Sequence, residues 1–278
     1  MNRRGKAFLL ALPTLLALLI LFVLPMLYIF FSTIGTDGLT YYEKFLTDSF
    51  YVNILWTTVR VSLKTTFFSL LLGYPAAFYL ARAKSKLKNL LMIMTVFPFL
   101  VSAVVRSYGW MVILGKNGLL NQLLLGIGLI HKPLTILYTE TAVVIGLVHL
   151  LTPYMILNVA SVIQGIDRNV EYAAYSLGAN PVFTFFKVVF PLSAPGVISG
   201  CILVFTLSMT GYVTPKLLGG AKFRVMSTMV FQEINVNFNW GFASAISYIL
   251  LFVILVILLS SNYLGMRYTK KLGGCRNA

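Results

Sequence analysis

Acidic residues, histidine and cysteine are all scarce in this sequence. The 278 residues include 7 Asp and Glu, 2 His and 2 Cys, and charged residues make up only 10% of the chain. Cys201, inside an apolar run, and Cys275, in a basic tail, cannot form a disulfide framework. His131 and His149 have no carboxylate at metal-ligand spacing. We therefore expect neither structural disulfides nor a metal site.

The residues of several catalytic chemistries are missing as well. No Asp or Glu falls inside the long apolar runs, so an intramembrane protease or acyltransferase would lack its paired acids or its activated nucleophile. No stretch resembles the phosphate-binding loop GxxxxGK[ST], so any ATP hydrolysis must occur on another protein. We therefore predict that the chain is not an enzyme.

Apolar residues dominate what is present. They make up 59% of the chain, and the mean hydropathy of +0.88 excludes an ordinary soluble domain. A run that crosses lipid must be helical, because lipid offers no partner for free backbone groups. We predict an all-α membrane protein with six transmembrane helices, at residues 7–31, 54–81, 90–114, 141–163, 188–215 and 234–266, the last two helices being shorter than these uncharged limits.

The charges predict how these helices are oriented. Lys and Arg total 22, which gives a net charge of +15, and they gather in residues 1–6, 82–88 and 267–276. Short cytoplasmic loops carry such an excess. Most acids fall on the opposite side, so we place both termini in the cytoplasm. The first run follows Arg3, Arg4 and Lys6, is too long for a signal-peptide core and lacks a small-residue cleavage site, so we expect it to be retained.

One predicted cytoplasmic loop, residues 164–196, is neither short nor strongly basic. Asp167 can cap a short helix, and Gly178 suits the left-handed position at its end. Asn180 and Pro181 can open a second helix, and Pro191 disturbs the entry into the fifth span. The loop is either a plain connector or a compact knob that a partner can hold.

The spacing in this loop resembles the cytoplasmic signature of ABC-importer permeases: Glu-Ala-Ala, three residues, Gly, nine residues, Ile, one residue, Leu-Pro. The residues in register are Ala173, Ala174, Gly178, Val188, Phe190 and Pro191. Tyr172 stands at the consensus glutamate position, with Glu171 one place earlier. The resemblance implies that the loop docks on an ATPase through a coupling helix, with either Glu171 or Tyr172 in the glutamate role.

Longer stretches narrow the likeness to permeases of the spermidine/putrescine type, and to the first subunit of the permease pair. These stretches are LLLGYPAAFYLAR (70–82), FPFLVSAVVRSYGW (97–110), GLLNQLLLGIGLI (118–130), VIGLVHLLTPYMIL (144–157) and YVTPKLLGGAK (212–222). The resemblance implies a type I importer fold. It divides the chain into an N-terminal helix with a periplasmic loop (1–54), a permease core (55–264) and a basic cytoplasmic tail (265–278).

The same resemblance implies a bacterial inner-membrane importer for a small polar solute, either a polyamine or a related amine. Its partners would be a second permease, two copies of an ABC ATPase that hold ATP and Mg²⁺, and a periplasmic solute-binding protein; this chain would bind no cofactor and no nucleic acid. An anionic or zwitterionic cargo, such as a phosphonate or an amino-acid derivative, remains an alternative. So does a stand-alone secondary transporter, although no inverted halves are evident.

Polar residues within the spans are candidates for the substrate pathway, because ionisable groups at membrane depth usually face a cavity or a partner. Snorkelling to the headgroups is the alternative for Arg60, and an interfacial aromatic belt is the alternative for Tyr108 and Trp110. A polyamine prefers acids and aromatic faces, whereas an anion would suit the three basic residues. The candidate pathway residues are Arg60, Lys64, Arg106, Tyr108, Trp110 and Tyr154.

Overall fold

The computed structural model describes residues 12–34, 38–83 and 85–273, and every regular element in these ranges is helical. The predicted all-α fold is therefore confirmed for this part of the chain. The first residues of the predicted span 7–31, the basic residues Arg3, Arg4 and Lys6, and the end of the tail at 274–278 lie outside the described residues.

The chain divides into two compact units. The first comprises residues 1–53 and 229–252. Its elements are the π-helical turn η1 (Leu19–Val23), α2 (Leu24–Ile34), α3 (Gly38–Thr47), the first residues of α4 (Ser49–Arg82), most of α13 (Met226–Asn235) and the first part of α14 (Trp240–Gly273).

Aromatic side chains form the centre of this first unit. Phe242 is fully buried, its ring lies 4.9 Å from that of Tyr51, and the Lys44 ammonium stands 4.7 Å above it. The Tyr248 hydroxyl donates a 2.6 Å hydrogen bond to the carbonyl of Met26. These contacts join α2, α3 and α14 within the unit.

The second unit comprises residues 54–228 and 253–278. It holds the rest of α4 and α14 together with α5 (Ser85–Leu100), α6 (Ala103–Leu114), α7 (Leu119–Gly126), α8 (Glu140–Gln164), α9 (Asn169–Ser176), α10 (Pro181–Thr184), η2 (Phe185–Val189), α11 (Phe190–Leu192), α12 (Ala194–Thr210) and η3 (Pro215–Gly219).

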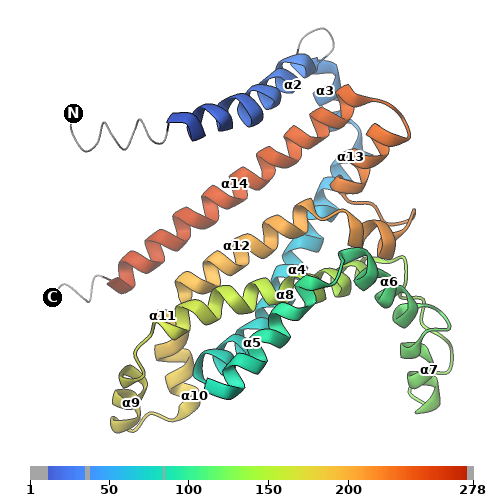
Figure 1. Ribbon diagram of the computed structural model, residues 1–278. Coiled ribbons are helices and arrows are strands. Elements are labelled where there is room, and N and C mark those ends of the chain that lie inside the picture. Colours follow the sequence, from blue (N-terminus) through green and yellow to red (C-terminus); the bar gives the residue numbers. More distant parts are fainter. Residues whose placement is uncertain (1–11, 35–37, 84, 274–278) are drawn as a thin grey trace, which may run out of the picture. The chain divides into compact units, whose positions relative to one another are not determined.

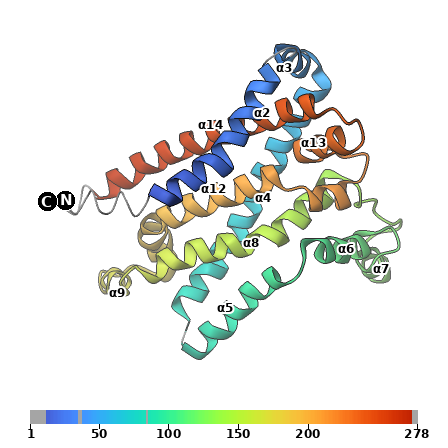
Figure 2. The same cartoon turned by 45° about the horizontal axis from the view of Figure 1, so that its top comes forward.

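Helices α8 and α12 lie side by side at the centre of the second unit (Figures 1 and 2). Glycines allow the close approach: a Cβ atom on Gly200 would lie 2.7 Å from Met155 Sδ, and one on Gly196 would lie 2.9 Å from Val162 Cβ. Small residues at such crossings let helix backbones come close without a cavity. Helix α4 packs against the same core through Tyr74 and Ala77.

Three helices in the described ranges are long and apolar enough to cross a membrane: 12–31, 140–164 and 240–263. Two further spans are possible if each of two bent helix pairs counts as one. Helix α4 has 34 residues but is not among these helices, and it carries Arg60 and Lys64.

The predicted continuous helix over residues 90–114 is wrong. Helices α5 and α6 meet at a 94° bend around Val101 and Ser102. Pro98 lies in the last turn of α5, and Ser102 caps α6 by accepting the Val104 N–H at 3.3 Å. Local backbone chemistry therefore breaks a run that apolarity alone suggests is continuous.

The last two spans are predicted to be shorter than the uncharged runs that contain them. Within the run 188–215, α12 begins at Ala194 after a 67° bend and ends at Thr210, and Pro215 opens η3. The sixth span does not begin at 234, because α13 ends at Asn235 and α14 begins at Trp240. Proline and cap residues inside uncharged stretches account for these differences.

The segment between α6 and α8 is organised by a buried amide. Asn121 is 1% exposed, and its Nδ2 donates to the carbonyls of Gly115, Lys116 and Leu134 at 3.1, 3.2 and 2.9 Å. Its Oδ1 accepts the Leu134 N–H at 2.8 Å. One side chain thus replaces several backbone partners in a segment that has little regular structure.

Candidate functional site

The loop between α8 and α12 has the turn chemistry that the sequence predicts. Asp167 Oδ1 accepts the Asn169 N–H at 2.9 Å at the start of α9. Gly178 has φ +83°, in the left-handed region where glycine is favoured. Asn180 Oδ1 accepts the Phe183 N–H at 2.7 Å, and Pro181 is the first residue of α10. The predicted helix–turn–helix is therefore confirmed.

The two candidates for the glutamate role face in opposite directions. Glu171 is 9% exposed and forms an ion pair with Arg82 at the end of α4. Arg82 Nη1 also donates to the Ile166 carbonyl at 3.2 Å, and Arg168 Nη2 donates to the Arg82 carbonyl at 2.7 Å. Tyr172 is 57% exposed. Glu171 is thus used within the chain, and Tyr172 is on the outer face.

The other predicted coupling residues differ in exposure. Ala173 and Gly178 are exposed, Ala174 is half-buried, and Pro191 is half-buried farther along in α11. Large apolar side chains are exposed on the same loop: Tyr172, Tyr175, Leu177, Val182, Phe183 and Phe186. An apolar surface of this kind is typical of a protein–protein contact.

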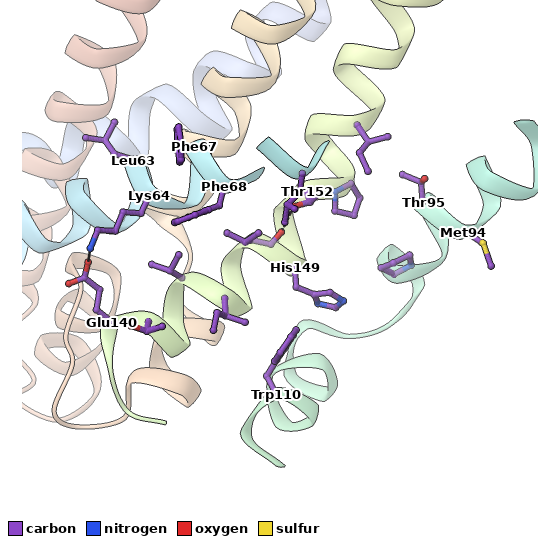
Figure 3. A pocket seen from close by; sticks show the side chains of 18 of the residues that line it. Leu63, Lys64, Phe67, Phe68, Met94, Thr95, Trp110, Glu140, His149 and Thr152 are labelled. Atoms are coloured by element: carbon purple, nitrogen blue, oxygen red, sulfur yellow. Dashed lines mark hydrogen bonds and ion pairs between the residues drawn. The ribbon is translucent and has the colours of Figure 1, made fainter. Parts of the chain in front are cut away.

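A cavity of about 1190 Å³ lies in the second unit among α4, α5, α6 and α8 (Figure 3). Most of its wall is apolar or aromatic, and the polar groups are few. The lining residues include Leu63, Lys64, Phe67, Phe68, Met94, Thr95, Trp110, Glu140, His149 and Thr152. Pockets with an apolar wall and a few placed polar groups are typical of small-molecule sites.

The charged wall of the cavity is an ion pair between α4 and α8. Lys64 Nζ lies 2.6 Å from Glu140 Oε1, and Arg60 Nη1 lies 4.0 Å from Glu140 Oε2. Figure 3 shows Lys64 reaching along the wall to Glu140. The side chains of Lys64 and Arg60 are 50% and 47% exposed, and that of Glu140 is 24% exposed. The pair is therefore accessible from the cavity.

The predicted pathway residues do not all meet at this cavity. Lys64 and Trp110 line it, and the Trp110 ring lies 5.6 Å from that of His149 in an edge-on arrangement. Arg60 approaches the cavity only through Glu140. Tyr108 is 53% exposed and is not among the described residues that line the cavity.

Arg106 and Tyr154 form a separate group beside the cavity. Arg106 lies within electrostatic range of both Tyr154 and His149. Its Nε and Nη1 atoms are buried and have no hydrogen-bond partner within the described ranges. The Tyr154 ring packs 4.6 Å from that of Phe99. The bend between α5 and α6 brings this arginine near α8.

Sequence reasoning missed several residues of the cavity wall. No motif in the sequence marks Glu140 or His149 as part of a cavity wall. One sequence signal does point to Glu140. Lys64 follows Arg60 by four residues, so two cations share one helical face, and such a face is stabilised by a nearby acid. Within the described ranges, no three His, Cys, Asp or Glu side chains gather as metal ligands would.

Known proteins resemble this chain over most of its length. The spermidine/putrescine transport system permease protein PotB of Haemophilus influenzae is 38% identical over 239 residues, covering 82% of this chain and 84% of that protein. PotB of Escherichia coli K12 is 36% identical over 215 residues, covering 77% and 78%.

Solved structures share the fold at low sequence identity. A chain of a bacterial alginate ABC transporter, crystallised with an alginate-bound periplasmic protein, superposes with a TM-score of 0.81 at 18% identity, covering 96% of each chain. A chain of the MetNI methionine ABC transporter gives 0.60 at 17% identity, covering 78% of this chain and 95% of that one. The all-helical importer-permease fold is thus supported by structure as well as sequence.

A family model also matches most of the chain. The family described as binding-protein-dependent transport system inner membrane component matches residues 69–270, which include the cavity residues Glu140 and His149 and the whole loop from α9 to α11. The chain therefore belongs to this family and is a permease subunit, without catalytic chemistry of its own, of an ABC importer.

Proposed function

We propose that this permease imports a polyamine or a related small organic cation. The observation that carries the proposal is the 38% identity with a spermidine/putrescine permease over 82% of the chain. The cavity adds chemical support, because it combines a carboxylate with aromatic rings, the two groups that attract organic ammonium ions.

The importer in this proposal has several subunits. A second permease completes the pathway, two copies of an ABC ATPase hold ATP and Mg²⁺, and a periplasmic binding protein delivers the cargo. A solved structural neighbour that contains a bound periplasmic protein supports such an assembly. The missing phosphate-binding loop supports ATP binding on a partner.

In the membrane, we place the loop 164–196 and both termini in the cytoplasm, with α4 crossing as one of six spans. The distribution of Lys and Arg supports this orientation. The exposed apolar face of α9 then points to the ATPase and forms the contact that transmits its movement. Ala173 and Gly178 let the partner approach this face closely, and Tyr172 supplies an aromatic contact where the consensus has glutamate.

An anionic or zwitterionic cargo is the second candidate, and Arg106 is the observation that favours it. Its buried, unpartnered nitrogens in the described structure would suit a carboxylate or a phosphonate. Two other candidate cations argue against an anionic cargo, because Arg60 and Lys64 are directed at Glu140. This leaves the cavity without two of the charges that an anion would need.

Reconstitution in proteoliposomes tests both cargo classes. The chain is co-purified with its second permease and ATPase, and uptake of labelled spermidine is compared with uptake of a labelled phosphonate. We expect spermidine uptake that requires both ATP and the loaded binding protein. Uptake of the phosphonate alone would overturn the polyamine assignment, and uptake by the lone chain would indicate a secondary transporter.

A further inference from the structure

We propose that Glu140 is the binding site for an ammonium group of the cargo within the permease, and that Lys64 occupies this site while the cavity is empty. This inference rests on the proposed function. It adds a specific acceptor for the cargo and a group built into the chain that competes with it.

The geometry around Glu140 suits such an exchange. The Lys64 ammonium lies 2.6 Å from Oε1, at the distance of a charge-assisted hydrogen bond. A primary ammonium at the end of a polyamine has the same charge and the same three donors, so it can make the contact that Lys64 makes now. Arg60 lies farther away, at 4.0 Å from Oε2, and does not fill the place of a directly bound ammonium.

The exposure of the pair makes exchange energetically feasible. The Lys64 side chain is 50% exposed and that of Glu140 is 24% exposed, so both charges remain partly solvated when they separate. Exposed ion pairs contribute little net stability. A cargo ammonium can therefore replace Lys64 without leaving a deeply buried charge unpaired, and the Lys64 ammonium can turn into the cavity.

The rest of the cavity suits the methylene chain between two ammonium groups. Figure 3 shows Phe68 near Lys64, and Trp110 and His149 farther along the wall. These rings offer apolar contact and, in Trp110, a strong cation–π surface. The hydroxyl groups of Thr95 and Thr152 also belong to the wall. One carboxylate at one end of an aromatic wall favours an elongated cation over a compact metal ion.

A purely structural role is the competing explanation for the same pair. Glu140 is the first residue of α8, where a negative charge is favourable, and Lys64 could simply join α4 to α8. The two explanations predict different effects of removing Lys64 on the affinity for cargo. If the pair is structural, removing either partner harms the protein in the same way. If Lys64 competes with cargo, its removal strengthens cargo binding, whereas removal of the Glu140 charge weakens it.

The test measures spermidine binding to the complete permease–ATPase complex in nanodiscs by calorimetry, without the binding protein. The variants are Lys64→Met and Glu140→Gln, with Lys116→Met as the matched control for loss of an exposed cation that is not paired with Glu140. We expect Lys64→Met to lower the Kd about tenfold and Glu140→Gln to raise it at least tenfold. Lys116→Met should change the Kd about twofold or less.

Melting temperatures of the three complexes identify variants that fail to fold. Equal weakening by Lys64→Met and Glu140→Gln, or binding by Lys64→Met no tighter than that of the wild type, overturns this inference. Failure of the proposed function is a separate result, because it shows as the absence of ATP-dependent spermidine uptake by the wild-type complex. If the wild-type complex takes up spermidine but Glu140→Gln does not change the Kd, the Glu140 site is rejected while the proposed function stands.

Discussion

Glu171 in α9 forms an ion pair with Arg82 at the C-terminal end of α4, and both side chains are largely buried, at 12% and 14% exposed. The pair connects the start of the loop between α8 and α12 to a long helix that also contributes to the cavity wall. A second contact strengthens this connection: the hydroxyls of Tyr74 in α4 and Ser193 lie 2.7 Å apart. The loop is thus attached to α4 by side-chain contacts as well as to α8 by the chain itself.

Removing one partner of the Arg82–Glu171 pair should be costly. Arg82→Met leaves the Glu171 carboxylate buried without its cation, and we expect a loss of about 3 kcal/mol in stability. Arg168→Met is the matched control, because it removes a single exposed hydrogen bond and should cost about 1 kcal/mol or less. Thermal unfolding of the purified complex measures both. An unchanged melting temperature for Arg82→Met would show that the pair does not hold the loop.

Tyr172 and Glu171 should give opposite phenotypes. Tyr172→Ala removes an exposed ring, so the permease should keep the melting temperature of the wild type. The amount of co-purified ATPase should fall severalfold. Glu171→Gln should lower the melting temperature, because it weakens the buried contact with Arg82. Quantitative co-purification combined with thermal unfolding separates the two effects. Normal ATPase recovery with Tyr172→Ala would exclude this ring from the docking face.

At Gly178, the effect of a substitution should depend on whether the new residue can adopt the left-handed backbone conformation, and not on the size of its side chain. A Cβ atom there would meet nothing within 4 Å, yet φ is +83°, which a β-branched residue adopts poorly. Gly178→Val should cost about 1–2 kcal/mol and reduce ATP-driven uptake, whereas Gly178→Asn should be milder because Asn tolerates this region. Uptake assays on both variants test this order. Equal activity of the two variants would contradict it.

Asn121 should control the order of the segment between α6 and α8. Asn121→Leu leaves the Leu134 N–H and the carbonyls of Gly115 and Lys116 without this partner, at an expected cost of about 2–3 kcal/mol. Limited proteolysis within residues 115–139 should accelerate. Gln122→Leu is the control, because it removes one exposed hydrogen bond to Asn117 and should leave the cleavage rate near that of the wild type.

Local sequence signals were sufficient for much of the fold. Apolar runs without charge predict helices, and the order Asp167, Gly178, Asn180 and Pro181 predicts the helix–turn–helix between α8 and α12. These signals act within a few residues, through caps, backbone conformation and missing donors. Predictions from apolarity are less accurate where a cap residue lies inside an apolar run, as Ser102 does.

Patterns of neighbouring residues are enough to predict the apolar helices and the short helix–turn–helix that ends at Gly178, because caps and apolar runs act locally. Long-range packing is what turns Glu171 inward to Arg82 and brings Lys64 to Glu140 across 76 residues of chain. Such pairings depend on which helix faces pack together, and no local pattern specifies them.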